Sequence, residues 1–240
     1  MKRAFLLEMT IFRDYARQLV GLGLLVSLCI GLGMQTPLAM PATLTCMFFM
    51  MSAMGLAAYD QLNHWELFRL TLPLSRRDVV LGRYAAIVTF GLLGMVVGLA
   101  AALAATAVVS AVGLPGEVGE AFAFDPDMLG VMAVVTCFTL LIGAVVASVV
   151  TPLYFRLGQT RATQILPTVI VLLFVVPVVI LGNSGMLDGD IPGMELVVAL
   201  DALDTPAGMA VGCVVLVALS AVALAISAAV SLKLYERREL

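Results

Sequence analysis

The residues best suited to chemistry lie together in one short stretch, Asn63 to Leu70, which reads NHWELFRL. It holds the chain's single tryptophan, Trp65, and its single histidine, His64, beside a carboxylate and a guanidinium group. The stretch contains no nucleophile–base pair and no phosphate-binding or metal-ligand spacing. Trp and Arg are instead the residue types most enriched at the energetic centres of protein interfaces. The stretch therefore indicates recognition of another molecule rather than catalysis.

No catalytic motif is predicted elsewhere in the chain. The phosphate-binding motif GxxxxGK[ST] needs a lysine after its glycines, and the only lysines, Lys2 and Lys233, lie in other contexts. Intramembrane proteolysis would need an HExxH motif, a buried aspartate pair, or a serine with a membrane histidine. We therefore predict that the chain is not an enzyme and carries no cofactor or metal. The cysteines have no CxxC spacing and are interpreted as small apolar residues: Cys29, Cys46, Cys137 and Cys213.

The composition predicts a membrane protein. The chain is 62% hydrophobic and 12% charged, whereas soluble domains are about 45–50% apolar and about one quarter charged. Its 240 residues can hold several spans of about 20 residues, but no further soluble domain of ordinary size. We therefore predict one transmembrane domain over 1–240, with the lipid bilayer as a partner and no nucleic acid.

Six membrane-spanning helices are predicted, each centred on an apolar stretch free of Asp, Glu, Lys and Arg. The third is longer than a bilayer of about 30 Å requires at about 1.5 Å per residue, and it should protrude on one side. The fold class is thus an all-α membrane protein. The predicted spans are about 19–34, 38–58, 79–113, 128–151, 162–182 and 205–232.

The basic residues predict the orientation of these spans. All 13 Lys and Arg residues fall on one side of the six-span arrangement, whereas the two longer loops on the other side carry only acids. By the positive-inside rule, the amino and carboxyl termini are both cytoplasmic. The basic residues are Lys2, Arg3, Arg13, Arg17, Arg69, Arg76, Arg77, Arg83, Arg156, Arg161, Lys233, Arg237 and Arg238.

The amino-terminal segment 1–18 is predicted to form an amphipathic helix in the cytoplasmic membrane interface, leading into the first span. One helical stripe is mainly apolar, from Phe5 through Phe12 to Leu19, and the opposite face carries Arg3, Arg13 and other polar residues. The alternative is that this segment simply continues the first span into the cytoplasm.

The predicted spans contain small residues at every fourth position of the third span, at Gly94, Gly98 and Ala102. Such a stripe lets another helix approach closely, so we predict helix packing, with contact to a substrate as the alternative. The charge-free stretches also lack the intramembrane carboxylate, histidine or lysine that ion-coupled carriers usually need. A secondary carrier is therefore disfavoured.

The segment 59–78 is the longest predicted cytoplasmic connection. A short helix from about 62 to 70 would end before Pro73, because the residue preceding a proline disfavours helical geometry. Its apolar residues occupy two faces, as expected of a helix wedged between its own bundle and a second protein. Ser75 and Asp78 then have the spacing of a helix-capping box at the start of the third span.

At these residues the chain resembles the membrane subunits of type-2 ABC transporters, particularly compact bacterial permeases. Their first cytoplasmic loop carries an acid, then Trp, then Leu-Pro-x-Ser-Arg. The six-span plan with both ends inside is also similar. His64 and Leu62 depart from the small or charged residues expected at their positions. The matching residues are Asp60, Trp65, Leu72, Pro73, Ser75 and Arg76.

The resemblance implies a role for the segment 59–78 as a cytoplasmic coupling helix. It would bind a groove of a separate ATP-binding subunit, which would hold ATP and Mg²⁺, and two permeases would pair around a pathway. Trp65 and Phe68 would be the anchors, although Trp65 could instead be an aromatic-belt residue at the headgroups. The implied partner-binding residues are Asn63, His64, Trp65, Glu66, Phe68, Arg69 and Leu70, and the capping and transmission residues are Pro73, Ser75, Arg76 and Asp78.

The resulting functional hypothesis is a permease subunit of an ATP-driven exporter in a bacterial plasma membrane. It would work as a homodimer or with a related permease. Uncharged spans suggest an amphipathic or hydrophobic cargo such as a peptide, drug or lipid. The alternative is a non-transporting membrane anchor or assembly protein that recruits a cytosolic partner through residues 59–78.

Overall fold

The structure, a computed structural model, describes residues 2–62, 75–113, 116–123, 126–183 and 205–236. Within these ranges it does not describe the side chains of 61–62, 118, 126–127, 157–164, 236 and most residues in 166–183. Every element in these ranges is a helix, as the all-α prediction requires. The helices are α1 (Lys2–Gly33), α2 (Ala39–Leu62), α4 (Arg76–Val112), α5 (Glu117–Ala121), α6 (Pro126–Asn183) and α8 (Pro206–Glu236).

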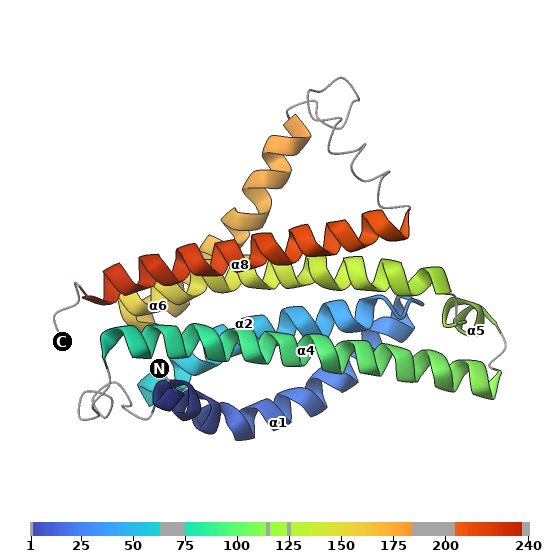
Figure 1. Cartoon of the computed structure of the whole chain (residues 1–240), viewed down its shortest axis with the longest axis horizontal. Helices are drawn as coiled ribbons and strands as arrows, with labels where there is room; N and C mark the ends of the chain where they lie inside the picture. The colour runs from blue at the N-terminus through green and yellow to red at the C-terminus, as the bar shows by residue number, and fades with distance from the viewer. Residues whose placement is uncertain (1, 63–74, 114–115, 124–125, 184–204, 237–240) are drawn as a thin grey trace.

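Within the described residues, five helices are long and apolar enough to cross a membrane, namely α1, α2, α4, the Met128–Arg156 part of α6, and α8. They lie side by side along the long axis of the molecule (Figure 1). Several such helices in one chain identify a multi-pass membrane protein. The predicted fifth span, 162–182, is helical within α6 but is not among the five, so the number six stays a prediction.

The start of α1, the start of α4 and the last turns of α8 lie at the same end of the bundle (Figure 1). We call this the basic end, because these segments and the middle of α6 hold all the described Lys and Arg residues. The opposite end, which includes α5, is called the acidic end, after Glu117 and Glu120. The basic residues in these segments are Lys2, Arg3, Arg13, Arg17, Arg76, Arg77, Arg83, Arg156, Arg161 and Lys233.

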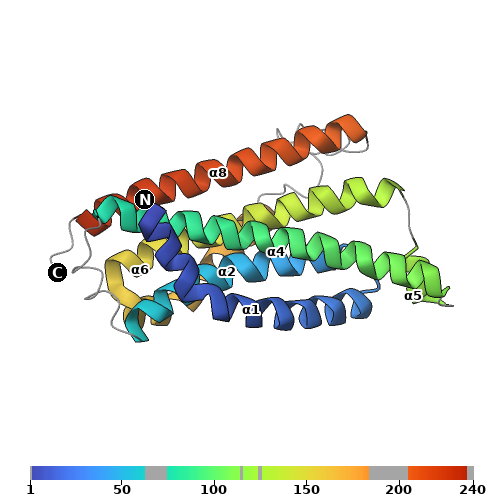
Figure 2. The same ribbon diagram turned by 60° about the horizontal axis from the view of Figure 1, so that its bottom comes forward.

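The first helix, α1, is continuous from Lys2 to Gly33 and bends partway along its length (Figure 2). Its first half has the predicted polar face, with Arg3, Arg13 and Arg17 exposed, and Phe12 buries its whole ring on the other side. No break therefore separates the segment 1–18 from the first span. Its position along the membrane surface stays a prediction.

The helix α6 is continuous over 58 residues, including the predicted connection between the fourth and fifth spans. At about 1.5 Å per residue it would be about 87 Å long if straight, far more than one bilayer crossing needs. Figure 1 shows how this length is accommodated, because the ribbon turns back sharply between its yellow and orange parts. The chain thus reverses direction near the basic end without a helix-free loop.

Aromatic side chains form the core where α1, α2 and α4 meet. Phe12, Phe48, Phe49 and Phe90 are almost fully buried in one cluster, and the ring centroids of Phe12 and Phe90 lie 4.7 Å apart in an edge-on contact. Edge-on aromatic pairs add to the stabilisation that packing alone supplies. This cluster fixes α1 against α4 at the level just inside the basic end.

Candidate functional site

The segment predicted to bind a partner lies between α2 and α4. Its residues 63–74, including Trp65, Phe68 and Pro73, lie outside the described residues. What the structure describes is the base of this connection: the end of α2 and the first turns of α4. These two helix ends are the anchor points of the connection.

The first turn of α4 is capped by Ser75. Its side-chain oxygen accepts a hydrogen bond from the backbone N–H of Asp78 at 3.1 Å, and its hydroxyl donates to Asp78 Oδ2 at 2.9 Å. Ser75 has an extended backbone and α4 begins at Arg76. A side-chain cap of this kind satisfies one of the amide groups that the first helical turn leaves without a partner. The cap thus fixes the residue at which the connection becomes helix.

Arg76 ties the start of α4 to the end of α8. Its Nη1 donates a hydrogen bond of 2.9 Å to the backbone oxygen of Tyr235, and its guanidinium carbon lies 5.8 Å from the centroid of that tyrosine ring. The Tyr235 ring in turn makes an edge-on contact with Phe155 of α6, with centroids 5.3 Å apart. The first residue of α4 is therefore connected to two other helices.

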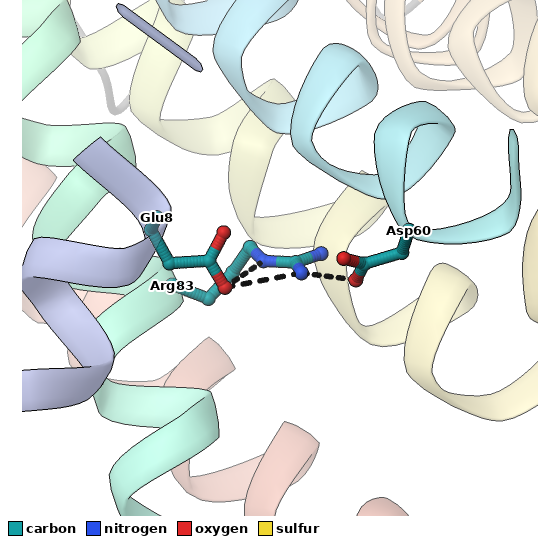
Figure 3. Close-up of polar contacts among 3 residues, drawn as sticks. All are labelled: Glu8, Asp60 and Arg83. Carbon is teal, nitrogen blue, oxygen red and sulfur yellow. Dashed lines mark hydrogen bonds and ion pairs between the residues drawn. The ribbon is translucent and has the colours of Figure 1, made fainter. Parts of the chain in front are cut away.

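Arg83 forms the centre of a buried ionic cluster that joins three helices (Figure 3). Its Nε and Nη2 each donate to Glu8 Oε1 of α1 at 3.2 Å, and Nη2 also donates to Asp60 Oδ2 of α2. The side chains of Arg83, Glu8 and Asp60 are only 4%, 3% and 12% exposed. We call these three residues the Arg83 cluster.

The electrostatics of the Arg83 cluster follow from its composition. Two carboxylates share one guanidinium, so with all groups ionised the cluster carries a net charge of −1. Taking such charges out of water is costly unless they remain paired, and charge-assisted hydrogen bonds are about twice as strong as neutral ones. Asp60 also lies near the C-terminal end of α2, where the helix dipole disfavours a negative charge. Arg83 is therefore the cation that the two buried carboxylates share.

The next residue, Tyr84, connects α4 to the opposite side of the bundle. Its hydroxyl lies 2.6 Å from the hydroxyl of Ser227 and 2.8 Å from that of Ser231, both on α8. Ser227 donates in turn to the backbone oxygen of Ser148 on α6 at 2.6 Å. Neighbouring residues of α4 thus bond to α1 and α2 on one side and to α8 on the other.

Beyond this region, α4 packs closely on α2. Gly94 and Gly98 are buried, and Ala102 is fully buried. A Cβ atom placed on Gly98 would lie 2.6 Å from Pro41 Cα, and one on Gly94 would lie 2.8 Å from Leu44 O. Small residues therefore allow the two backbones to approach. The helices α2 and α4 are therefore in contact both at the basic end, through Asp60 and Arg83, and farther along their length, through Gly94 and Gly98.

Sequence reasoning missed the Arg83 cluster. In the sequence, Asp60 stands out only as part of a loop pattern, and Glu8 belongs to no motif. A signal was present, because Glu8 lies on the same helical stripe as Phe5 and Phe12, which are apolar. A charged residue on an apolar stripe needs a partner from another element, but the sequence alone does not identify that partner.

The described side chains do not form a site for metal chemistry. In that part of the chain, no group of three or more His, Cys, Asp or Glu residues could hold a metal ion. The polar groups at the basic end instead bond to one another and join helices. Because these contacts join helices, they can pass a displacement of one helix to its neighbours.

The comparisons with known proteins point to one family. Residues 6–236 match the model of a family described as "ABC-2 family transporter protein". No curated protein and no solved structure gives a significant match to the chain. The matched range includes the Arg83 cluster, the connection between α2 and α4, and the five candidate membrane-crossing helices except for the first residues of α1.

Proposed function

We propose an ATP-driven export function for this chain, because the chain belongs to the ABC-2 family of transporter proteins. In this proposal it is the permease, the membrane component of an ABC transporter. A separate subunit binds and hydrolyses ATP with Mg²⁺, and two permeases, identical or related, form the pathway between them. The family match over residues 6–236 is the observation that carries the proposal.

The basic end is the part of the permease that faces the ATP-binding subunit. The positive-inside rule assigns an end rich in Lys and Arg to the cytoplasm, where ATP is available. The connection between α2 and α4 leaves the bundle at this end, and residues 63–70 supply Trp65, Phe68 and Arg69 as contact residues. We assign the chain to a bacterial plasma membrane, with both termini in the cytoplasm.

Transport follows from movement of the two ATP-binding subunits. When they close on ATP, they displace the segments 59–78 of the two permeases, and α4 carries the displacement toward the acidic end. The pathway then changes its accessibility between the two sides of the membrane. Its cargo is amphipathic or hydrophobic, since the apolar stretches of the spans carry no ionised side chain to recognise a charged solute.

Photo-crosslinking tests the assignment of the partner surface. A photoreactive phenylalanine analogue is placed at Trp65 in the full chain, which is expressed together with the candidate ATP-binding subunit. The expected result is a covalent adduct with that subunit after illumination. The matched control is the same analogue at Phe138, an exposed aromatic residue of the membrane-crossing part of α6. Adducts at both positions, or at neither, would contradict the assignment.

A further inference from the structure

The connection between α2 and α4 is closed at its base by an ion pair. Asp60 lies near the last turn of α2, and Arg83 lies about two turns into α4, so their bond joins the two anchor points of residues 63–74. Any force on that segment reaches α2 and α4 at positions that are already bonded to each other.

Glu8 connects a third helix, α1, to the ion pair between Asp60 and Arg83. It contacts Arg83 through two hydrogen bonds of 3.2 Å, one from Nε and one from Nη2, and Nη2 is also the donor to Asp60 (Figure 3). Because guanidinium is planar and its donors are fixed in direction, such a pair restricts rotation as well as separation. The start of α1 is therefore held in a defined orientation relative to α4.

The same turns of α4 reach the remaining membrane-crossing helices by other contacts. Arg76 is bonded to Tyr235 of α8, Tyr84 to Ser227 of α8, and the Arg83 guanidinium lies 5.8 Å from the Phe155 ring of α6. Among these described contacts, the ones that Arg83 makes to Glu8 of α1 and Asp60 of α2 are between full charges. The start of α4 is thus joined to α1 and α2 by a buried ion-pair cluster and to α8 and α6 by hydrogen bonds and ring contacts.

Stability alone does not require charge at this place. Buried ion pairs can often be replaced by uncharged groups of similar volume without loss of stability, because the desolvation cost offsets the attraction between the charges. The directional restraint is what an uncharged replacement cannot reproduce. We propose that Arg83 is a positioning residue that makes α1, α2 and α4 move as one body when an ATP-binding subunit displaces residues 63–74. This inference rests on the proposed function.

The test compares the wild-type chain with two variants in the reconstituted complex with its ATP-binding subunit. The charge-free variant combines Glu8→Gln, Asp60→Asn and Arg83→Gln, which keeps the size of the two acidic side chains and leaves amides that can form neutral hydrogen bonds. The second variant, Arg83→Lys, keeps the positive charge but loses the planar fork of donors. The matched control is Arg13→Gln, which changes an exposed guanidinium.

The readout is movement at the far end of the bundle. Spin labels are attached through Val112→Cys on α4 and Val211→Cys on α8, both exposed positions near the acidic end, in a chain whose four native cysteines are replaced. The distance between the labels is measured by pulsed electron paramagnetic resonance, without nucleotide and after trapping with ATP and vanadate. Association of the subunits and ATP turnover are measured on the same samples.

The expected result is that both variants assemble and hydrolyse ATP, whereas the nucleotide-dependent shift seen in the wild type and in Arg13→Gln is lost. Retention of the shift in either variant would overturn the inference and leave the proposed function intact. If only one variant assembles with the ATP-binding subunit, the distance shift measured in that variant alone decides whether the inference holds. Failure of both to assemble would assign the Arg83 cluster to folding alone and overturn the inference. A wild-type chain that does not bind the ATP-binding subunit would remove the proposed function itself.

Discussion

At the scale of single residues, Arg83 has the largest expected effect on stability. Replacing it by methionine removes the guanidinium that pairs with the buried carboxylates of Glu8 and Asp60. Removing one partner of a buried ion pair typically costs about 3–5 kcal/mol, so Arg83→Met should lower the free energy of unfolding by about that amount. The charge-free triple variant should recover most of the loss. Unfolding of the purified protein in detergent, followed by circular dichroism, measures both effects.

The control for this prediction is Arg13→Met. The Arg13 side chain is 64% exposed and its ion pair with Asp14 is open to solvent. Exposed ion pairs contribute about 0–1 kcal/mol, so this substitution should leave the unfolding transition nearly unchanged. Equal destabilisation by Arg83→Met and Arg13→Met would show that burial of the Arg83 cluster does not matter for stability.

Individual residues were predictable from sequence only where their partners are local. Ser75 and Asp78 are three positions apart, so their capping interaction is readable from spacing alone. Glu8 and Arg83 are 75 positions apart, and their pairing depends on how α1 crosses α4. The same holds for Tyr84 and Ser227, because a hydroxyl in an apolar helix has many alternative partners, including its own backbone.

At the scale of helices, the close approach of α2 and α4 should be sensitive to a single added methyl group. In Gly98→Ala the new Cβ would lie 2.6 Å from Pro41 Cα, which is backbone and cannot move aside as a flexible side chain would. Overpacking of this kind costs about 1–3 kcal/mol, so the free energy of unfolding in detergent should fall by a similar amount.

Gly21→Ala provides the matched control within α1. A Cβ atom at Gly21 would meet nothing within 4 Å, and alanine favours a helix over glycine by up to about 1 kcal/mol. This variant should therefore unfold at the same or a higher temperature than the wild type. If Gly98→Ala behaves like Gly21→Ala, the two helices are not in the close contact described.

The presence of several long apolar helices was predictable, because continuous apolar stretches of bilayer length leave few alternatives. The continuity of two of these helices was not predictable. The segment 2–18 continues into the rest of α1, and the predicted connection 152–161 is helical within α6. Charged residues mark where a helix leaves the hydrocarbon, but they do not by themselves end a helix.

At the scale of the whole molecule, the proposed orientation predicts which end is reachable from outside the cell. Single cysteines are introduced at Met34, near the acidic end, and at Lys233, near the basic end, in a chain whose four native cysteines are replaced. A membrane-impermeant maleimide should label position 34 in intact cells. It should label position 233 only after permeabilisation. The reverse pattern would invert the orientation and place the proposed coupling segment outside the cell.

The fold class and the family could be inferred from composition and one loop pattern, because both are local properties of the chain. The Arg83 cluster could not be inferred in this way, since its three residues come from α1, α2 and α4. A sequence identifies which segments enter the membrane, but a cluster shared by three helices depends on their crossing geometry. The part of the proposed mechanism that passes displacement between helices therefore required the structure.

ATP turnover by the separate ATP-binding subunit tests the central claim most directly. It is measured in liposomes with the subunit alone, with the wild-type chain, and with Trp65→Ala at equal amounts of incorporated protein. Our account predicts that the wild-type chain changes the turnover rate and that Trp65→Ala abolishes this change or releases the subunit. Turnover that is the same in all three samples, with association unaffected by the substitution, would contradict the claim that this chain is driven by ATP through residues 63–70.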